Sequence, residues 1–269
     1  MPSIKNKVVW ITGASSGIGE ALTYELAKKG ARLILSARRK EELEKVKGNC
    51  DPAVQANIRI LPLDLTQTDT LQLTTEAAIQ LFGHVDILIN NGGISQRSLA
   101  KDTSVDVDRR IMEVNYFGAV AVTKFLLPHF LQRKSGHYVT ISSLTGHIGT
   151  PYRSGYAASK HALHGFFDSL RAELWKEVGN GIIVTMICPG FVHPPITLSA
   201  VTGDGTPLGK MDEAQFKGMP AAECAQRIVS AIEKQKDEVY IGRKEVLGVY
   251  MKRFFPGLFV RIIRKAAVR

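Results

Sequence analysis

Short apolar runs alternate along this chain with longer segments in which apolar residues recur every three or four positions. This alternation predicts strands connected by helices, which is the pattern of an α/β domain. The apolar run at 85–89 is typical of a strand buried inside a parallel sheet. We expect strands at 7–12, 31–36, 58–63, 85–89, 136–141, 181–187 and 238–241, and helices at 66–82, 102–134 with a break near 105–108, from 154 onward, and 220–235.

The turn after the first expected strand is rich in glycine. Its glycines are spaced Gly-x-x-x-Gly-x-Gly over 13–19, and a helical pattern follows at once. Glycines let a backbone approach a pyrophosphate, and free N–H groups at a helix start bind anions, so we favour a dinucleotide-binding turn. The same residues also fit the Gly-x-Ser-x-Gly elbow of hydrolases, with Ser15 as the nucleophile. That alternative leaves Gly19 without a role.

The end of the second strand indicates which dinucleotide binds. An NAD site usually has an acidic residue there, but this chain has Arg38 and Arg39. Arginine pairs well with phosphate, so we predict NADP with Arg38, nearer the strand end, in contact with its 2′-phosphate. The alternative is a solvated basic helix start.

Polar residues follow several other strands. Asp64 ends the third, where it caps the next helix, bonds an adenine amino group, or does both. The segment 90–93 is Asn-Asn-Gly-Gly, a turn that permits close backbone approach. Asn115 lies among apolar residues and needs partners, either a neighbouring backbone group or an ordered water. Ser142 and Ser143 end the fifth strand, and one of them is a candidate to hold a substrate oxygen.

A tyrosine and a lysine lie four residues apart at Tyr156 and Lys160. On a helix, this spacing places both side chains on one face. A nearby ammonium favours phenolate, so we expect the pKa of Tyr156 to fall and the residue to pass protons near neutral pH. Alone, such a pair often arises by chance on a solvated helix.

Composition bounds the remaining possibilities. The chain has 269 residues, 45% of them hydrophobic, and a formal charge of +10. Residues 243–269 hold eight Lys/Arg and one Glu, so the basic character belongs to the tail and does not indicate nucleic-acid binding. From 246 on, apolar residues recur on one helical face, which suits a membrane surface, a partner subunit or the chain's own core. Three scattered cysteines suggest a reducing compartment, and the polar start at 1–7 predicts no signal peptide, so we expect a cytoplasmic protein.

The histidines do not predict a metal site. His161 and His164 lie three apart, but no carboxylate or cysteine lies close to them in the sequence. We therefore expect no metal. The segment 193–219 is irregular and rich in Pro, Gly and Thr, which predicts a substrate-binding loop or lid.

Together these residues resemble the classical short-chain dehydrogenase/reductase family. The motifs occur in family order and at family spacing across 5–242, and within the family the chain most resembles the 7B-type dehydrogenase/reductase members. Two departures are Gly92, where the family has alanine, and Pro194, where it has a threonine that bonds the nicotinamide carboxamide. The matching segments are 12–19, Asp64, 90–93, Asn115, Ser143, 156–160 and 189–190.

This resemblance implies a Rossmann-like, doubly wound sheet of seven parallel strands in one domain at 1–242, with an extension at 243–269. It implies a homodimer or homotetramer that reduces a carbonyl or oxidises an alcohol. It assigns proton transfer to Tyr156, its tuning to Lys160, the substrate oxygen to Ser143 and a relay water to Asn115. The implied contacts of the cofactor are Gly13, Ser15, Ser16, Gly17, Ile18, Gly19, Arg38, Asp64, Leu65, Asn91, Gly92, Tyr156, Lys160, Pro189, Gly190 and Val192.

Apolar residues around the expected pocket favour an apolar or lipid-like substrate: Leu144, Ile148, Phe191, Ile196 and Leu198. A nucleotide-binding interaction protein or membrane-surface protein on the same fold is the alternative from a different class. A scaffold does not need the set of Asn115, Ser143, Tyr156 and Lys160, which therefore favours an enzyme.

Overall fold

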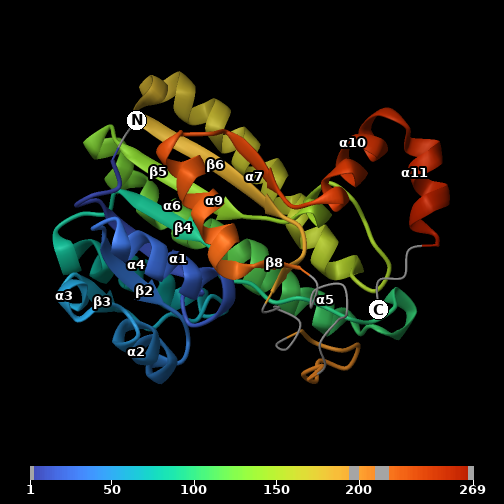
Figure 1. Cartoon of the computed structure of the whole chain (residues 1–269), viewed down its shortest axis with the longest axis horizontal. Helices are drawn as coiled ribbons and strands as arrows, with labels where there is room; N and C mark the ends of the chain where they lie inside the picture. Colours follow the sequence, from blue (N-terminus) through green and yellow to red (C-terminus); the bar gives the residue numbers. More distant parts are fainter. Residues whose placement is uncertain (1–2, 194–199, 210–217, 266–269) are drawn as a thin grey trace.

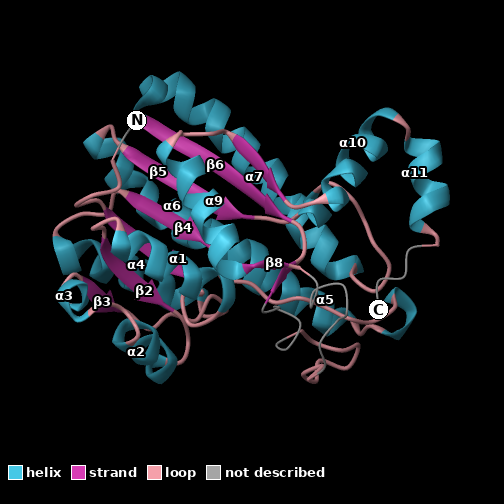
Figure 2. Cartoon of the chain, in the orientation of Figure 1, coloured by secondary structure: helices cyan, strands magenta, loops and turns pink. Residues whose placement is uncertain are grey.

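The first strand, β1 (Val8–Thr12), shows why helices cover both sides of the sheet. Val9 and Ile11 join one buried cluster, whereas Val8 and Trp10 join a second. Successive side chains of a strand point to opposite faces, so each face needs its own cover. Helices α1, α2 and α9 supply one cover and α4, α6 and α7 the other. Figure 2 shows the strands between these two helical layers.

The computed structural model describes residues 3–193, 200–209 and 218–265. Seven parallel strands form the main sheet in the order β3-β2-β1-β4-β5-β6-β9 (Figure 1), which confirms the predicted doubly wound fold. A short parallel pair, β7 and β8, lies apart from it. The strands are β1, β2 (Arg32–Ser36), β3 (Ile58–Ile60), β4 (Ile87–Asn90), β5 (Gly136–Ile141), β6 (Ile182–Pro189), β7 (Val192–His193), β8 (Met219–Pro220) and β9 (Glu238–Ile241).

Helices fill the connections between the strands. Short 3₁₀ turns lie at Ala100–Asp102, Leu144–Gly146 (η3), Gly179–Gly181 and Lys244–Val246. The α-helices are α1 (Gly17–Lys28), α2 (Lys40–Gly48), α3 (Pro52–Gln55), α4 (Thr68–Phe82), α5 (Val105–Met112), α6 (Gly118–Arg133), α7 (Ser154–Val178), α9 (Ala221–Glu233), α10 (Leu247–Phe254) and α11 (Pro256–Ile263).

The long helical region after β4 differs from the prediction. We expected a break near 105–108, but α5 begins at Val105, where Ser104 accepts a hydrogen bond from the N–H of Val107 and caps the helix. The irregularity comes later, as a π turn over Glu113–Phe117 between α5 and α6. Smaller differences are a third strand that stops at Ile60, a fourth that starts at Ile87 and a helix α4 that starts at Thr68.

The strand order reverses between β1 and β4, and open α/β sheets bind ligands at the carboxyl ends of strands beside such a point. The glycine turn leaves the sheet at this edge. The tail forms two helices, α10 and α11, which lie beyond one end of the sheet in Figure 1. Val249 and Phe259 pack there with Leu144, Ile148 and Cys188 in a small separate core.

Candidate active site

The glycine turn is held tightly against the end of β4. The side-chain amide of Asn91 donates to the carbonyls of Thr12 (3.1 Å) and Gly13 (3.0 Å). The Thr12 hydroxyl in turn accepts from the N–H groups of Asn91 and Gly92, both at 3.1 Å. Gly13 has φ +65°, and a Cβ there would lie 2.7 Å from the Cα of Gly92. Only glycine therefore fits at Gly13.

The start of α1 has the features of an anion site. Its N-cap, Ser16, makes no side-chain cap bond, so the hydroxyl does not satisfy the first N–H groups of the helix. Gly17 has φ +59° and faces open space, whereas a Cβ on Gly19 would lie 2.2 Å from the Gly13 carbonyl oxygen. Gly17 thus leaves the approach clear while Gly19 lets helix and turn pack closely. Ser15 and Ile18, both partly buried, complete the turn.

The residues expected near the adenosine end lie at this same edge. Arg38 is exposed two residues after the end of β2. Asp64 accepts from the N–H (3.0 Å) and hydroxyl (2.8 Å) of Thr66, so it organises a turn and does not cap α4, whose N-cap is Gln67. Leu65 is buried, and a Cβ on Gly92 would lie 2.6 Å from its side chain.

Asn115 lies in the π turn, a rare helix form that is frequent at functional sites. Its side-chain oxygen accepts from the Ile94 N–H (2.8 Å), and its amide donates to the Ile94 carbonyl (2.9 Å) and to the Ser159 hydroxyl (3.0 Å). Of the two partners expected for this buried amide, the structure shows the backbone group. Asn115 therefore joins the segment after β4 to α7.

Tyr156 and Lys160 lie one turn apart on α7, as predicted. The first turn of this helix is capped from a distance. The side-chain oxygen of Gln96, which is fully buried, accepts from the N–H groups of Gly155 (2.9 Å) and Tyr156 (3.4 Å). Gln96 was not predicted from the sequence, because a cap 59 residues away in the chain leaves no local signal.

The pKa of Tyr156 shifts in the direction opposite to the prediction. Burial raises it, and a hydrogen bond to Ser143 and the charges of Arg153 and Arg97 only partly oppose that effect. Lys160 does not supply the expected lowering. Desolvation of this partly buried phenol outweighs the nearby charges, so it is a neutral proton donor near neutral pH. Arg97 and Arg153 are further residues near this site that sequence analysis missed.

Lys160 is nearly fully buried, and its ammonium donates to the Ile141 carbonyl at the end of β5 (2.8 Å). The ammonium nitrogen lies 5.7 Å from the centre of the Tyr156 ring. Desolvation lowers the pKa of Lys160 to about 8, with the Cys188 thiol acting in the other direction. At pH 7 the side chain therefore remains mostly charged.

Ser143 follows β5 and faces the same space. Its hydroxyl accepts from the Thr145 N–H (3.1 Å) and donates to the Pro189 carbonyl (3.4 Å). The neighbouring Ser142 points elsewhere, and its hydroxyl lies 2.9 Å from Nε2 of His164. We call Asn115, Ser143, Tyr156 and Lys160 the tyrosine cluster.

The segment after β6 borders this cluster. Pro189 ends the strand, the Gly190 N–H donates to the Ile241 carbonyl (2.8 Å), and Val192 is buried in β7. A Cβ on Gly190 would lie 2.4 Å from the Glu245 carboxylate. Pro194, Ile196 and Leu198 lie outside the described residues.

The hydrolase alternative gains no support from the turn geometry. Ser15 is partly buried there, and within the described part of the chain no histidine or carboxylate hydrogen-bonds its hydroxyl. A serine nucleophile needs such a base beside it.

The prediction that no cysteine or carboxylate accompanies the histidines was wrong for the folded chain. His164 has both a cysteine and a carboxylate close by in space, because Cys188 on β6 and Glu238 on β9 lie beside it together with His147. We call these four residues the histidine cluster. Among the described residues they are a possible set of metal ligands, and they come from distant parts of the sequence.

Comparison with known proteins agrees with these findings. A family model described as short chain dehydrogenase matches residues 7–204. Human dehydrogenase/reductase SDR family member 7 is 45% identical over 257 residues, which cover 94% of this chain and 75% of the relative. Bovine dehydrogenase/reductase SDR family member 7B is 44% identical over 98% of this chain and 82% of the relative.

Solved structures show the same fold at lower identity. A short chain dehydrogenase from Burkholderia cenocepacia, in complex with NADP, has a TM-score of 0.79 and 21% identity, covering 98% of this chain and all of that one. One from Burkholderia phymatum, in complex with NAD, has a TM-score of 0.80 and 22% identity, covering 96% of each chain.

Proposed function

The chain belongs to the short-chain dehydrogenase family, and on that premise we propose that it is an NADP(H)-dependent oxidoreductase that interconverts a carbonyl and an alcohol. One observation carries the proposal. A partly buried phenol, Tyr156, lies near enough to Ser143 for that hydroxyl to lower its pKa, and it has the Lys160 ammonium one helical turn away. A proton donor, a second hydroxyl and a fixed charge thus meet at the carboxyl edge of the sheet.

The glycine turn fits a dinucleotide. Gly13 and Gly19 allow backbone packing that a Cβ would block, while Gly17 faces open space at the uncapped start of α1. In our proposal the pyrophosphate lies there, held by N–H groups of residues 15–19, with Asn91 and Gly92 beside the turn. Asp64 and Leu65 border the adenine, and Pro189, Gly190 and Val192 border the nicotinamide end. When bound, the reduced cofactor supplies the hydride.

The side chains of this protein handle the proton. In the reductive direction, Tyr156 donates its proton to the carbonyl oxygen of the substrate, and Ser143 donates a hydrogen bond to the same oxygen. The raised pKa of Tyr156 keeps it protonated and ready to donate. Lys160, charged at pH 7, holds the nicotinamide ribose and supplies the proton that returns to Tyr156.

Asn115 is a positioning residue for the step in which Tyr156 regains its proton. Its amide is committed to Ile94 and Ser159, so it fixes the π turn where a relay water to Lys160 would bind.

The decisive test is Tyr156→Phe, assayed with a panel of carbonyls at the NADPH absorbance band. We expect turnover to fall by about 10³-fold or more with NADPH binding unchanged, because the proton donor alone is removed. Tyr250→Phe is the matched control, since Tyr250 is half exposed on α10. Retained turnover in Tyr156→Phe contradicts the mechanism. Dinucleotide binding by an intact protein that reduces no carbonyl would favour the non-catalytic alternative.

The preference for NADP(H) rests on Arg38, exposed at the end of β2. Losing a charge-assisted bond to the 2′-phosphate in Arg38→Ala should raise the KM for NADPH about 10- to 100-fold and leave that for NADH nearly unchanged. Arg39→Ala is the matched control, because Arg39 is also exposed and next in the chain. If Arg38→Ala and Arg39→Ala change the KM values for NADPH and NADH equally, Arg38 does not provide a preference for NADP(H).

An apolar or lipid-like substrate is the finer part of the proposal. Leu144 and Ile148 follow Ser143 and are buried, and both belong to the small core that α10 and α11 complete. A panel graded by acyl length or ring number tests this, with kcat/KM expected to rise with apolar size.

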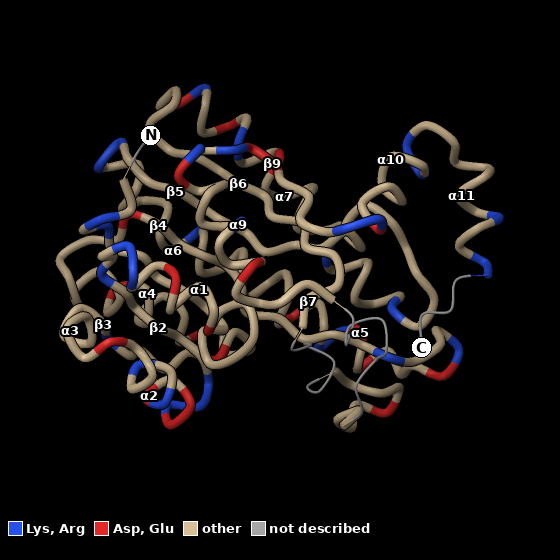
Figure 3. The backbone as a smooth tube through the Cα atoms, in the orientation of Figure 1, with Lys and Arg blue, Asp and Glu red and all other residues tan. Residues whose placement is uncertain are grey.

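The extension at 243–269 is proposed to contact a membrane surface. Figure 3 shows Lys and Arg along α10 and α11, and residues 247–265 hold no Asp or Glu. Leu247, Phe254 and Phe255 are more than 60% exposed, which suits an anionic interface. No helix in the described ranges is long and apolar enough to cross a bilayer.

Anionic liposomes should pellet the full chain but not a chain ending at Gly242. Equal pelleting of the two chains would contradict membrane contact through the extension. A cytoplasmic location, peripheral on a membrane, remains part of this proposal.

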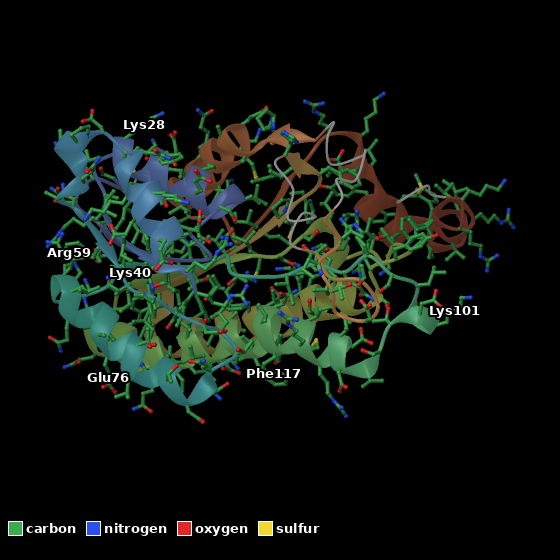
Figure 4. All side chains as sticks on the ribbon, turned by 90° about the horizontal axis from the view of Figure 1, so that it is seen from below. Lys28, Lys40, Arg59, Glu76, Lys101 and Phe117 are labelled. Atoms are coloured by element: carbon green, nitrogen blue, oxygen red, sulfur yellow. The ribbon has the colours of Figure 1, made fainter. Side chains whose placement is uncertain are left out.

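A homodimer or homotetramer is proposed through the outer side of α4 and α6. Phe117 is half exposed and points outward from that helical layer (Figure 4), and Val120, Ala121 and Phe125 line a shallow apolar hollow beside it. Such exposed apolar area favours association. Light scattering of the full chain and of Phe117→Glu tests this, with a smaller mass expected for the variant.

A further inference from the structure

We propose that the histidine cluster is a binding site for one divalent transition metal of the zinc class. It consists of His147, His164, Cys188 and Glu238, and it is separate from the residues that the proposed reaction uses. Each residue offers one ligand atom, and these atoms lie within 4.8 Å of one another. Two imidazoles, a thiol and a carboxylate are the donor types that Zn²⁺ prefers.

The distances in the cluster suit a tetrahedral centre. Metal–ligand bonds of about 2.0 to 2.3 Å at tetrahedral angles place pairs of ligand atoms about 3.5 Å apart. The Cys188 sulfur lies 3.6 Å from Oε1 of Glu238 and 3.8 Å from Nε2 of His147. Nδ1 of His164 lies 3.7 Å from the same carboxylate oxygen. Nε2 of His147 and Oε1 of Glu238, 2.7 Å apart, must separate by about 1 Å.

A second partner orients His164 as metal ligands are commonly oriented. Its Nε2 lies 2.9 Å from the Ser142 hydroxyl, which leaves Nδ1 for the metal. Gly146 makes room for this ring, because a Cβ there would lie 2.7 Å from it. Ser142 and Gly146 therefore hold the imidazole in place, and its Nδ1 atom still faces Glu238.

The site is closed by protein ligands yet reachable from solvent. His164 and Cys188 are buried, whereas the side chain of Glu238 is 36% exposed and offers an entry path. The ligands come from the end of η3, from α7, from β6 and from β9, and 91 residues separate His147 from Glu238. Four protein ligands indicate a structural metal, which would tie these elements together and stabilise the folded chain.

The test uses the untagged full chain, since a histidine tag binds Zn²⁺ itself. The protein is stripped with a chelator, titrated with Zn²⁺ and analysed for bound metal after gel filtration. We expect one Zn²⁺ per chain and a Tm raised by about 5 °C or more at saturating metal. Co²⁺ in place of Zn²⁺ should give the visible bands of a tetrahedral ion and a sulfur-to-cobalt charge-transfer band.

Variants locate the metal. Cys188→Ser should abolish the charge-transfer band, and Glu238→Gln should weaken Zn²⁺ binding at least about tenfold by removing one ligand charge. Glu238 is partly exposed on the edge strand β9, so that variant keeps the test valid if Cys188→Ser does not fold. The controls are His161→Gln on the same helix and Cys224→Ser on α9, and both should bind metal as the unaltered chain does.

Two results would overturn the site. One is no retained Zn²⁺ and no rise in Tm, which would leave a hydrogen-bonded cluster only. The other is binding that is equally strong in Cys188→Ser and Glu238→Gln, which would place the metal elsewhere.

Discussion

One face of α7 carries residues of two chemically different clusters. Tyr156, Lys160 and His164 follow one another at intervals of one helical turn, and the tyrosine cluster gives way to the histidine cluster between the second and the third. The loop after β5 separates them in the same way, because Ser143 faces Tyr156 while Ser142 faces His164. Adjacent residues of one segment therefore serve different sites.

The clusters differ in how the fold assembles them. In the tyrosine cluster, the proton donor and its charged neighbour come from one short stretch of one helix, so the spacing alone predicts that they meet. In the histidine cluster every member comes from a different segment, and the pairing of β6 with β9 sets Glu238 opposite Met186, two residues before Cys188. A site of the second kind becomes visible only once the strand order is known.

The largest expected effect is the difference in kcat between alanine variants of the two neighbouring serines. Ser143→Ala should lower kcat by about 10³-fold, because the substrate oxygen and Tyr156 both lose a hydrogen-bond partner. Ser142→Ala should change kcat by less than about threefold, since its hydroxyl bonds His164 and the Lys160 carbonyl instead. Steady-state kinetics with NADPH and the best carbonyl of the panel measure both.

The serine comparison has a clear adverse outcome. If Ser142→Ala loses as much turnover as Ser143→Ala, the two clusters act as one site and their separation is wrong. A matching Tm for the two variants serves as the folding control.

The sequence predicted the sheet well because its strands are buried runs with clear ends. Residues 136–141 and 238–241 form strands with the predicted bounds, and seven parallel strands are present. The π turn at Glu113–Phe117 was not predicted, since its residues have an ordinary helical pattern. The region 194–199 and 210–217, where a substrate loop is expected, lies outside the described residues.

The direction of the Tyr156 pKa shift could not be predicted from the sequence. The four-residue spacing correctly placed Lys160 near Tyr156, but it carried no information on burial. Burial decides the direction of the pKa shift of the phenol, and Arg97 and Arg153, which oppose it, come from segments that the motif does not include.

A further buried histidine, His137, lies outside both clusters and shows how burial acts on an imidazole in this sheet. His137 on β5 lies 2.8 Å from the Thr185 hydroxyl, and burial lowers its pKa to about 4. Between that value and about 6.5 the unfolded chain binds a proton that the folded chain does not, so stability falls as the pH falls. The loss approaches about 3 kcal/mol near pH 4.

Urea unfolding from pH 8 to pH 4 measures this loss against His137→Gln, whose stability should depend less on pH. Groups common to both proteins, His164 among them, cancel in the difference. The free energies of unfolding of the two proteins should run parallel above pH 7. If they stay parallel down to pH 4, His137 binds its proton equally well in the folded and the unfolded chain.

The smallest expected effect concerns how α7 holds the tyrosine cluster in place. Gln96→Ala removes the acceptor for the N–H groups of Gly155 and Tyr156, so we expect a loss of about 1 to 2 kcal/mol in the free energy of unfolding. The catalytic phenol loses its positioning, and kcat should fall about tenfold while the KM for NADPH holds. The control is Gln72→Ala, at an exposed site on α4, whose free energy of unfolding should change by less than about 0.5 kcal/mol.

The Gln96 variant should retain the Zn²⁺ affinity of the unaltered chain, because His164 lies two turns along α7 from the lost cap. A parallel loss of metal affinity would mean that the first turn of α7 governs both clusters and that they cannot be disturbed separately.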